Sequence, residues 1–227
     1  SLQFVLFFLI FYVLYRSFGN HFRFQNIILL LGCYLFYAFW DIRFLFILII
    51  PTTLDYLFAI MIQHGTLKIR QKVTSSLILL VSFLFMVFIH YDSITINYQN
   101  HPFSLNVDYL NIISPYGPKI LLGIIALIII LNIIFVKSES WEIKTRKKFY
   151  VTLSVVINLS LLGFFKYFNF FVDSFSALTK NIFGISSDPH IVKILLPVGI
   201  SFYIFKTISY VVDVYRGKIV SSENLLD

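Results

Sequence analysis

The residues of this sequence that could do chemistry are a few polar side chains set inside long apolar stretches. An ionisable group within a membrane-spanning segment costs about 2.5–3.5 kcal/mol, so it normally faces a protein interior or a wet cavity. Such groups can accept hydrogen bonds between helices or line a polar tunnel. The candidates for lining a core or a funnel are Asp55, Asn158, Lys166, Lys206, Ser209 and Asp213.

Asp55 lies near the middle of one apolar stretch, 44–62. At about 100° of rotation per residue in a helix, Thr52, Asp55 and Tyr56 fall within about 100° of arc. This side of the predicted helix is therefore polar. Asp55 is either a hydrogen-bond acceptor between helices or part of a polar site, and we favour the structural role.

A second polar stripe follows the apolar stretch 149–171 and covers about 120° of one helix face. Its members are Ser154, Asn158, Lys166 and Asn169. Lys166 lies roughly 9 Å from the midpoint of the stretch, towards the outer side, so its ammonium can reach the lipid headgroups. That depth is poor for a direct pair with Asp55. The stripe is more typical of an inward helix face than of a catalytic site.

The third cluster lies in 191–215 and at its end, within about 80° of arc. Its members are Lys206, Ser209, Asp213 and Arg216. The cluster could line a polar tunnel, or it could be a helix end with its own charge pairs at the cytoplasmic interface. We favour the interface for Arg216 and the interior for Lys206, which lies deeper.

No enzymatic constellation is visible among these residues. The histidines are His21, His64, His90, His101 and His190, all in loops or at the ends of apolar stretches. None has the spacing of metal ligands, and the sequence has no Gly-rich phosphate loop, nucleophile elbow or cysteine cluster. We therefore predict no catalytic residue, no cofactor and no metal in this sequence.

The elements that must position these residues are predicted to be membrane helices. Hydrophobic residues make up 59% of the chain and charged residues 13%, whereas soluble domains carry about 25% charged residues. The apolar segments are 2–15, 27–40, 44–62, 73–90, 119–136, 149–171 and 191–215. The predicted fold class is all-α, a polytopic transmembrane bundle of about seven segments. Pro197 and Gly199 favour a broken or re-entrant last segment, with an ordinary proline-kinked crossing as the alternative.

The distribution of basic residues predicts the topology. Of the 18 Lys and Arg, twelve lie in 16–24, 63–72, 137–148 and 216–227, and two lie in the alternate connections 41–43, 91–118 and 172–190. This is the positive-inside pattern, which puts the N-terminus outside and 137–148 in the cytoplasm. The net charge of +7 is thus a topology signal, and we expect no nucleic-acid partner.

Four stretches resemble one known family in the same order along the chain. They are CYLFYAFWDIRF (33–44), TTLDYLFA (52–59), LLGFFKYFNFFVD (161–173) and LPVGISFYIFKTISYVVDVYRGK (196–218). They are similar to the bacterial membrane-bound O-acyltransferases (MBOAT), in the branch of the alginate O-acetylation membrane subunit. The resemblance implies a single transmembrane domain over 1–227, the N-terminal part of a larger fold. Within it, 73–148 is expected to be an extra hairpin with an outer loop at 91–118.

The same resemblance implies a funnel through which an acyl group passes from a cytoplasmic donor to an acceptor outside. The catalytic histidine of the family follows a Trp-rich helix downstream of the VDVYRG motif. No histidine of this sequence stands in such a context, so no catalytic residue is carried over. We expect this piece to be inactive by itself, and we expect the Lys166 helix and Pro197–Arg216 to be walls of the core.

The leading hypothesis is therefore the N-terminal part of an O-acyltransferase in the bacterial cytoplasmic membrane. It would transfer an acyl group, expected to be acetyl, to a hydroxyl of a cell-envelope polysaccharide. The expected partners are acyl-CoA or an acyl carrier on the cytoplasmic side, the extracytoplasmic polysaccharide and membrane lipid. The alternatives are a non-enzymatic membrane scaffold or transporter subunit, and a substrate-translocating channel.

Overall fold

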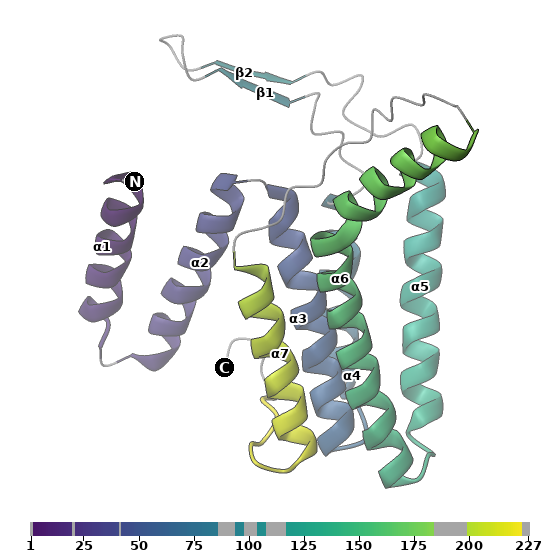
Figure 1. Ribbon diagram of the computed structural model, residues 1–227. Helices are drawn as coiled ribbons and strands as arrows, with labels where there is room; N and C mark the ends of the chain where they lie inside the picture. Colours follow the sequence, from purple (N-terminus) through teal and green to yellow (C-terminus); the bar gives the residue numbers. More distant parts are fainter. Residues whose placement is uncertain are drawn as a thin grey trace.

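The computed structural model describes residues 2–19, 21–40, 42–85, 94–97, 104–107, 117–183 and 199–223. These residues form seven α-helices and one two-stranded sheet (Figure 1). The elements are α1 (Leu2–Ser17), α2 (Phe22–Trp40), α3 (Ile42–Gln63), α4 (Ile69–Phe83), β1 (Ile94–Asn97), β2 (Ser104–Val107), α5 (Gly117–Ser138), α6 (Ile143–Phe183) and α7 (Ile200–Tyr215). The predicted all-α bundle of about seven segments is confirmed.

Within the described residues, three helices are long and apolar enough to cross a membrane: Leu45–Gln63, Lys119–Ser138 and Ile143–Ser174. Phe4–Ser17 and Phe22–Ala38 are shorter apolar helices. A 19-residue span measures about 29 Å at 1.5 Å per residue, which matches a hydrocarbon core of about 30 Å. The chain is thus a multi-pass membrane protein.

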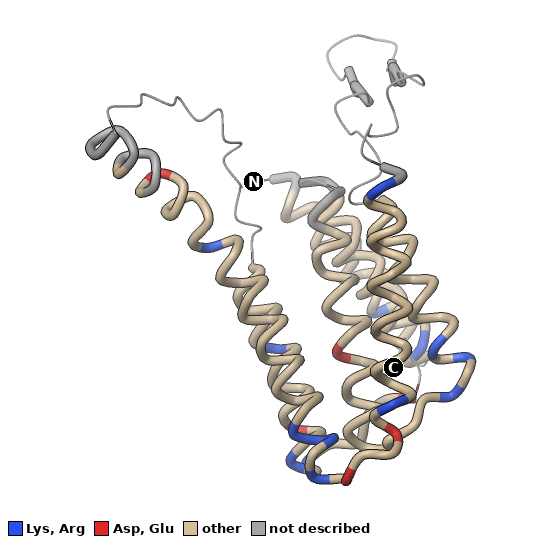
Figure 2. The backbone as a smooth tube through the Cα atoms, turned by 90° about the vertical axis from the view of Figure 1, so that its right-hand side faces the viewer, with Lys and Arg blue, Asp and Glu red and all other residues tan. Residues whose placement is uncertain are grey.

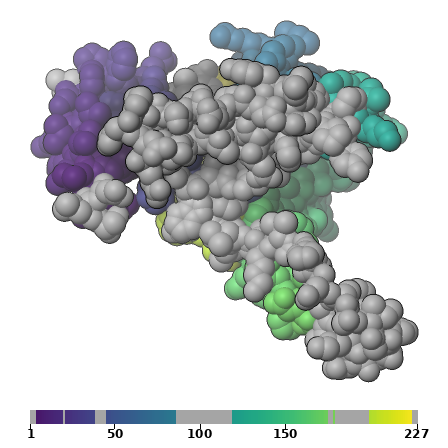
Figure 3. Space-filling view, turned by 90° about the horizontal axis from the view of Figure 1, so that it is seen from above, coloured from purple at the N-terminus to yellow at the C-terminus, as the bar shows by residue number. Residues whose placement is uncertain are grey.

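Helix α3 forms the centre of the bundle and contacts α2, α4, α6 and α7. Inside the protein, 72% of its spanning window is buried, compared with 11% of the window in α5. The α1–α2 pair lies on one flank and α5 on the other, as the views from the side and from above both show (Figures 1 and 3). Polar groups on α3 therefore face protein, whereas most of α5 presents apolar side chains outward.

Large side chains fill the core beside the second half of α3. Phe58 and Tyr150 are fully buried, with ring centroids 5.6 Å apart. Phe135 of α5 stacks on Tyr150 at 5.8 Å. The Tyr150 hydroxyl lies 2.5 Å from the Ser138 Oγ. Burial of aromatic rings of this size, with the polar tip hydrogen-bonded, is a main source of packing energy at a helix junction.

The connections with the basic residues lie at one end of the bundle. The turns 64–68 and 139–142 and the segment 216–223 are at the lower end of Figure 1. Lys and Arg gather there in Figure 2. This arrangement agrees with the predicted alternation of basic and non-basic connections. The assignment of that end to the cytoplasm stays a prediction.

Some boundaries differ from those expected from hydropathy. Helix α6 continues to Phe183, beyond the end expected at 171, and its outer part leans away from the bundle (Figure 1). The expected outer loop 91–118 contains the antiparallel pair β1–β2, in which Ile94 pairs with Val107. Hydropathy windows detect only the apolar part of a helix, and a four-residue strand leaves almost no periodic signal.

Helix α7 begins directly after Gly199, whose φ of +78° is in the left-handed region that glycine adopts without penalty. Pro197 and the rest of 191–198 lie outside the described residues, so a broken or re-entrant segment stays a prediction. The helix ends in a Schellman motif, in which the Lys218 amide donates to the Asp213 carbonyl at 2.9 Å and Gly217 donates to Val214 at 3.0 Å. The motif turns the chain back towards the α3–α4 turn.

Candidate functional site

The polar interior of the described chain is a hydrogen-bonded cluster around the Asp55 carboxylate, between α3, α6 and α7. Asp55 is only 3% exposed. Ser154 Oγ donates to Asp55 Oδ1 at 2.5 Å, and Asn158 Nδ2 donates to Oδ2 at 2.9 Å. The two donors are four residues apart on α6, so they lie one above the other on a single helix face. Both carboxylate oxygens are therefore satisfied by the same helix.

Asn158 extends the cluster to α7. The Thr207 hydroxyl lies 3.2 Å from Asn158 Oδ1 and donates to it. Asn158 Nδ2 also donates to the Ser154 carbonyl at 3.0 Å. The amide is 1% exposed, so it uses both its donor and its acceptor ends inside the bundle. One asparagine thus joins three helices.

A second polar junction lies one turn earlier on α3. Thr52 Oγ1 donates to the Leu48 carbonyl at 2.7 Å, and the Tyr203 hydroxyl donates to the same carbonyl at 2.8 Å. The Thr52 and Tyr203 hydroxyls also contact each other directly. The Leu48 carbonyl and the two hydroxyls thus form one compact hydrogen-bonded group between α3 and α7. This junction holds the first turn of α7 against α3.

The geometry of the Asp55 cluster is that of a helix-joining acceptor. Within the described residues, no Lys or Arg forms an ion pair with Asp55, and no histidine contacts it. Hydrogen bonds to a charged group contribute about 1.5–3 kcal/mol each, and leaving such a group unpaired costs more. Two good donors therefore compensate much of the desolvation of the carboxylate.

The remaining predicted site residues lie outside this cluster. The side chains of Lys166, Lys206 and Ser209 are exposed, and Asp213 is half-buried. Lys166 Nζ lies 5.6 Å from the ring centroid of Tyr167, and Asp213 Oδ1 lies 3.7 Å from the Lys218 ammonium. The predicted lining of a core or funnel by these four residues stays a prediction. No ion pair joins Lys166 to Asp55 in the described chain.

Sequence reasoning missed the roles of Thr207 and Tyr203. Thr207 stands next to Lys206 but points to a different side of α7, so a search for charged stripes passed it over. Tyr203 sits in an apolar run, where the only signal is that a buried tyrosine hydroxyl usually needs a partner. The matching acceptors, Asn158 and Leu48, come from other helices. Pairings of this kind depend on the packing of the bundle.

The segment after α7 is fastened to the turn between α3 and α4. Tyr56 OH donates to the Glu223 carbonyl at 2.8 Å, and the Lys68 ammonium lies 2.6 Å from Glu223 Oε2. The hydrogen bond and the charge of Lys68 lower the pKa of the exposed Glu223 carboxyl. The Ser221 amide donates to Gln63 Oε1. The C-terminal end of α7 is thus held close to the C-terminal end of α3.

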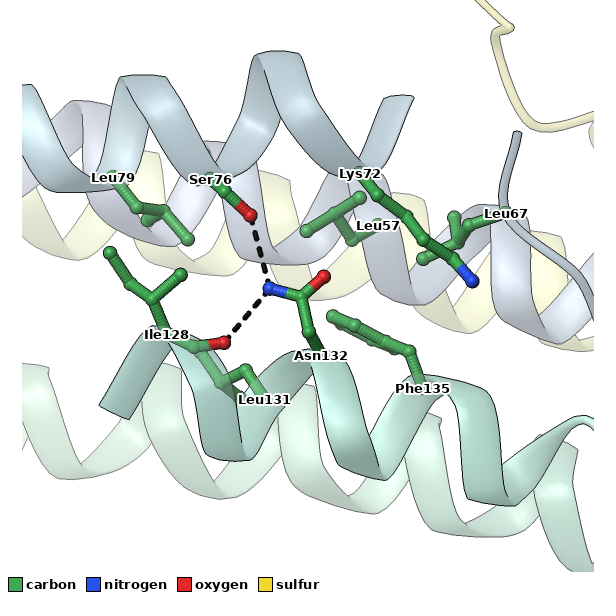
Figure 4. Close-up of a pocket in the computed structure, with 9 residues that line it drawn as sticks. All are labelled: Leu57, Leu67, Lys72, Ser76, Leu79, Ile128, Leu131, Asn132 and Phe135. Carbon is green, nitrogen blue, oxygen red and sulfur yellow. Dashed lines mark hydrogen bonds between the residues drawn. The ribbon is translucent and has the colours of Figure 1, made fainter. Parts of the chain in front are cut away.

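A small cavity lies between α3, α4 and α5 (Figure 4). Asn132 Nδ2 donates to Ser76 Oγ at 3.1 Å and to the Ile128 carbonyl at 2.8 Å at its edge. The cavity holds about 10 Å³, which is room for one water at most. It is therefore no site for a substrate. Among the described residues, no group of three or more His, Cys, Asp or Glu side chains could hold a metal ion.

These features define a class, the polytopic membrane bundle with a hydrogen-bonded polar interior. Comparison with known proteins shows which members of this class the chain is similar to. The chain is 52% identical over 79 residues to a protein of Azotobacter vinelandii named "Probable alginate O-acetylase AlgI". The AlgI of Pseudomonas aeruginosa is 48% identical over 79 residues. A peptidoglycan O-acetyltransferase of Helicobacter pylori is 36% identical over 70 residues. The resemblance to this acyltransferase branch is thus confirmed over part of the chain.

The extent of these matches is limited. The 79 residues are 34% of this chain and 15% of the AlgI proteins of both species, and the Helicobacter match covers 31% and 12%. No profile of a known family matches the chain. No solved structure matches it either. The similarity therefore concerns a third of the chain and a small share of each relative.

Proposed function

We propose that this chain is part of a membrane-bound O-acyltransferase that transfers an acetyl group to a hydroxyl of a cell-envelope polysaccharide. The observation that carries this proposal is the identity of about half over 79 residues with alginate O-acetylases. The similar peptidoglycan O-acetyltransferase acts, by its name, on another envelope polymer. O-acetylation of a glycan is the feature that these names share.

In the proposed enzyme, the described residues supply the frame of the core. The Asp55–Asn158–Thr207 bonds fix α7 against α3 and α6, so Asp55 and Asn158 have a structural role. The uncovered face of α7, with Lys206, Ser209 and the half-buried Asp213, is proposed to face the interior of the complete enzyme. Lys166 is proposed to reach the outer interface.

The proposed reaction is acyl transfer from a thioester. The acceptor hydroxyl oxygen attacks the thioester carbonyl, a general base takes the hydroxyl proton, and the thiol leaves, so that an ester replaces the thioester. The donor is proposed to be acyl-CoA or an acyl carrier at the basic end of the bundle, and the membrane is proposed to be the cytoplasmic membrane. We assign the base to none of the described residues; His21 and His64 are exposed beside helix ends.

Gene deletion tests the proposal. Deletion in the source bacterium should lower the ester-linked acetate of its envelope polysaccharide, measured after mild alkaline release. The full-length gene should restore it. Unchanged acetate in the deletion strain would contradict the proposal, provided that no second similar gene is expressed. If the chain were a scaffold or transporter subunit, a related acetylase supplied in its place would leave acetylation low, because the missing subunit would not be replaced.

A further inference from the structure

Arg146 is a buried cation at the basic end of the bundle, between α6 and the turn that follows α3. Its side chain is 8% exposed, and Nε donates to the Met61 carbonyl at 3.3 Å. The flat face of the guanidinium lies against Gly65, because a Cβ on Gly65 would overlap the guanidinium carbon and both terminal nitrogens. These two contacts fix the orientation of the guanidinium.

The terminal nitrogens of Arg146 have no acceptor among the described residues. Glu142, four residues earlier on the chain, is exposed and forms no ion pair with Arg146 in the described chain. The described side-chain atoms that are both fully buried and without a partner are the Ser75 and Ser221 hydroxyls. The terminal nitrogens of Arg146 are therefore reached by solvent, and they present a two-pronged donor to it.

Two other carboxylates at this end of the bundle already have partners. Glu223 lies 2.6 Å from the Lys68 ammonium, and Glu139 lies 3.1 Å from the Lys72 ammonium. The described part of the chain thus neutralises these two lysines and leaves Arg146 without a counter-charge.

The surroundings of Arg146 are strongly positive. Lys144 and Lys148 are exposed and Lys147 is half-buried, and the first turn of α6 has no acidic residue. The partial positive charge of a helix N-terminus adds to these cations. The positive-inside rule accounts for exposed lysines in this connection, but it does not require a buried guanidinium held in one orientation. The arrangement suits an anion with more than one charge.

We propose that Arg146 binds a phosphate group of a coenzyme A thioester, the acyl donor. A planar guanidinium binds phosphate through two parallel N–H···O bonds. Coenzyme A carries several phosphate charges on the group that bears its thiol, whereas the arm of an acyl carrier and a simple anionic lipid carry one phosphodiester. The surrounding lysines therefore favour coenzyme A. This inference rests on the proposed function, because it names the donor of that reaction.

Arginine modification of the unaltered full-length protein tests the site. In nanodiscs of phosphatidylcholine, phenylglyoxal should label Arg146, and coenzyme A at about ten times its dissociation constant should lower that labelling about tenfold. Arg70 is the internal control, since it is exposed in the first turn of α4 and should be labelled equally in both samples. Pantetheine, which has the thiol arm without the phosphates, should not protect Arg146.

Three results of this experiment would overturn the proposal. Absence of any labelling at Arg146 would mean that its terminal nitrogens are closed to solvent. Equal protection by pantetheine would mean that phosphate is not recognised. Protection by phosphatidylglycerol in the nanodisc, with none by coenzyme A, would identify the ligand as a lipid headgroup.

A substitution tests the same contact by affinity. Arg146→Lys keeps the positive charge beside the Met61 carbonyl but loses the two-pronged donor, so the dissociation constant of coenzyme A measured by calorimetry should rise at least about tenfold. Arg70→Lys should leave it unchanged. Unchanged affinity in folded Arg146→Lys would refute the proposal, and if this variant does not fold, the protection experiment decides. Neither readout requires acetyl transfer, so a failure here is distinct from unchanged acetate in the deletion strain.

Discussion

Asp55 is the residue on which the described polar interior depends. Its carboxylate accepts hydrogen bonds from two side chains of α6, and one of these, Asn158, also accepts a hydrogen bond from Thr207 of α7. A buried carboxylate in a membrane bundle is retained only where such donors converge on it. The junction of α3, α6 and α7 therefore depends on one acceptor, the Asp55 carboxylate, and on the groups that hydrogen-bond to it directly or through Asn158.

The first prediction concerns this carboxylate. Asp55→Leu leaves the Ser154 hydroxyl and the Asn158 amide without their acceptor, and we expect a loss of about 2–4 kcal/mol of stability. Thermal unfolding in detergent, followed by fluorescence-detected gel filtration, measures it. Thr53→Val is the matched control, because within the described residues the buried Thr53 hydroxyl donates to the Ile49 carbonyl of its own helix and joins no second helix. Equal melting shifts for the two variants would argue against a structural role for Asp55.

A second prediction concerns Gly65, whose φ is +80°. A Cβ there would overlap the Arg146 guanidinium, and Arg146 Nε donates to the Met61 carbonyl at the end of α3. Gly65→Ala should cost at least about 1–2 kcal/mol through backbone strain alone, and it should displace Arg146 as well. Gly123→Ala on α5 is the control, since nothing lies within 4 Å of a Cβ there. If Gly65→Ala melted like Gly123→Ala, the close contact with Arg146 would be wrong.

At the scale of elements, the position of α7 depends on hydroxyl contacts with α3 and α6. Tyr203→Phe removes the bond to the Leu48 carbonyl while keeping the ring, and we expect about 1 kcal/mol of destabilisation. Tyr215→Phe, at a 39% exposed position of the same helix, should change the melting temperature little. The melting temperatures of the two variants measure the difference, and a larger decrease for Tyr215→Phe than for Tyr203→Phe would contradict the described packing of α7.

The helices and their inward faces are largely predictable from the sequence, for physical reasons. Apolar runs predict helices because lipid requires the backbone to satisfy its own hydrogen bonds. The stripe of Ser154 and Asn158 predicts the inward face of α6 because polar side chains avoid lipid. The extension of α6 to Phe183 is not predictable by hydropathy, because Asp173 and Ser174 break the apolar run. The contact of Thr207 with Asn158 arises only once two distant helices pack together.

For the molecule as a whole, the prediction is its orientation in the membrane, with 91–118 outside and 137–148 in the cytoplasm. With Cys33 replaced by Ser, single cysteines placed in 91–118 should react with a membrane-impermeant maleimide in intact cells. Cysteines placed in 137–148 should react only after permeabilisation, because the basic connections are retained in the cytoplasm. The reverse labelling pattern would overturn the topology and, with it, the proposed side of the donor.

We propose that this bundle belongs to an enzyme that moves an acetyl group across a membrane onto a glycan. Full-length protein in sealed vesicles, with the basic end facing the lumen, tests it most directly. Radiolabelled acetyl-CoA is enclosed and the envelope polysaccharide of the source bacterium is added outside. We predict alkali-labile label on the external polysaccharide, and none with Asp55→Leu vesicles, in which the core is disrupted. Labelled acetate that stays inside, with intact protein and accessible polysaccharide, would contradict the account.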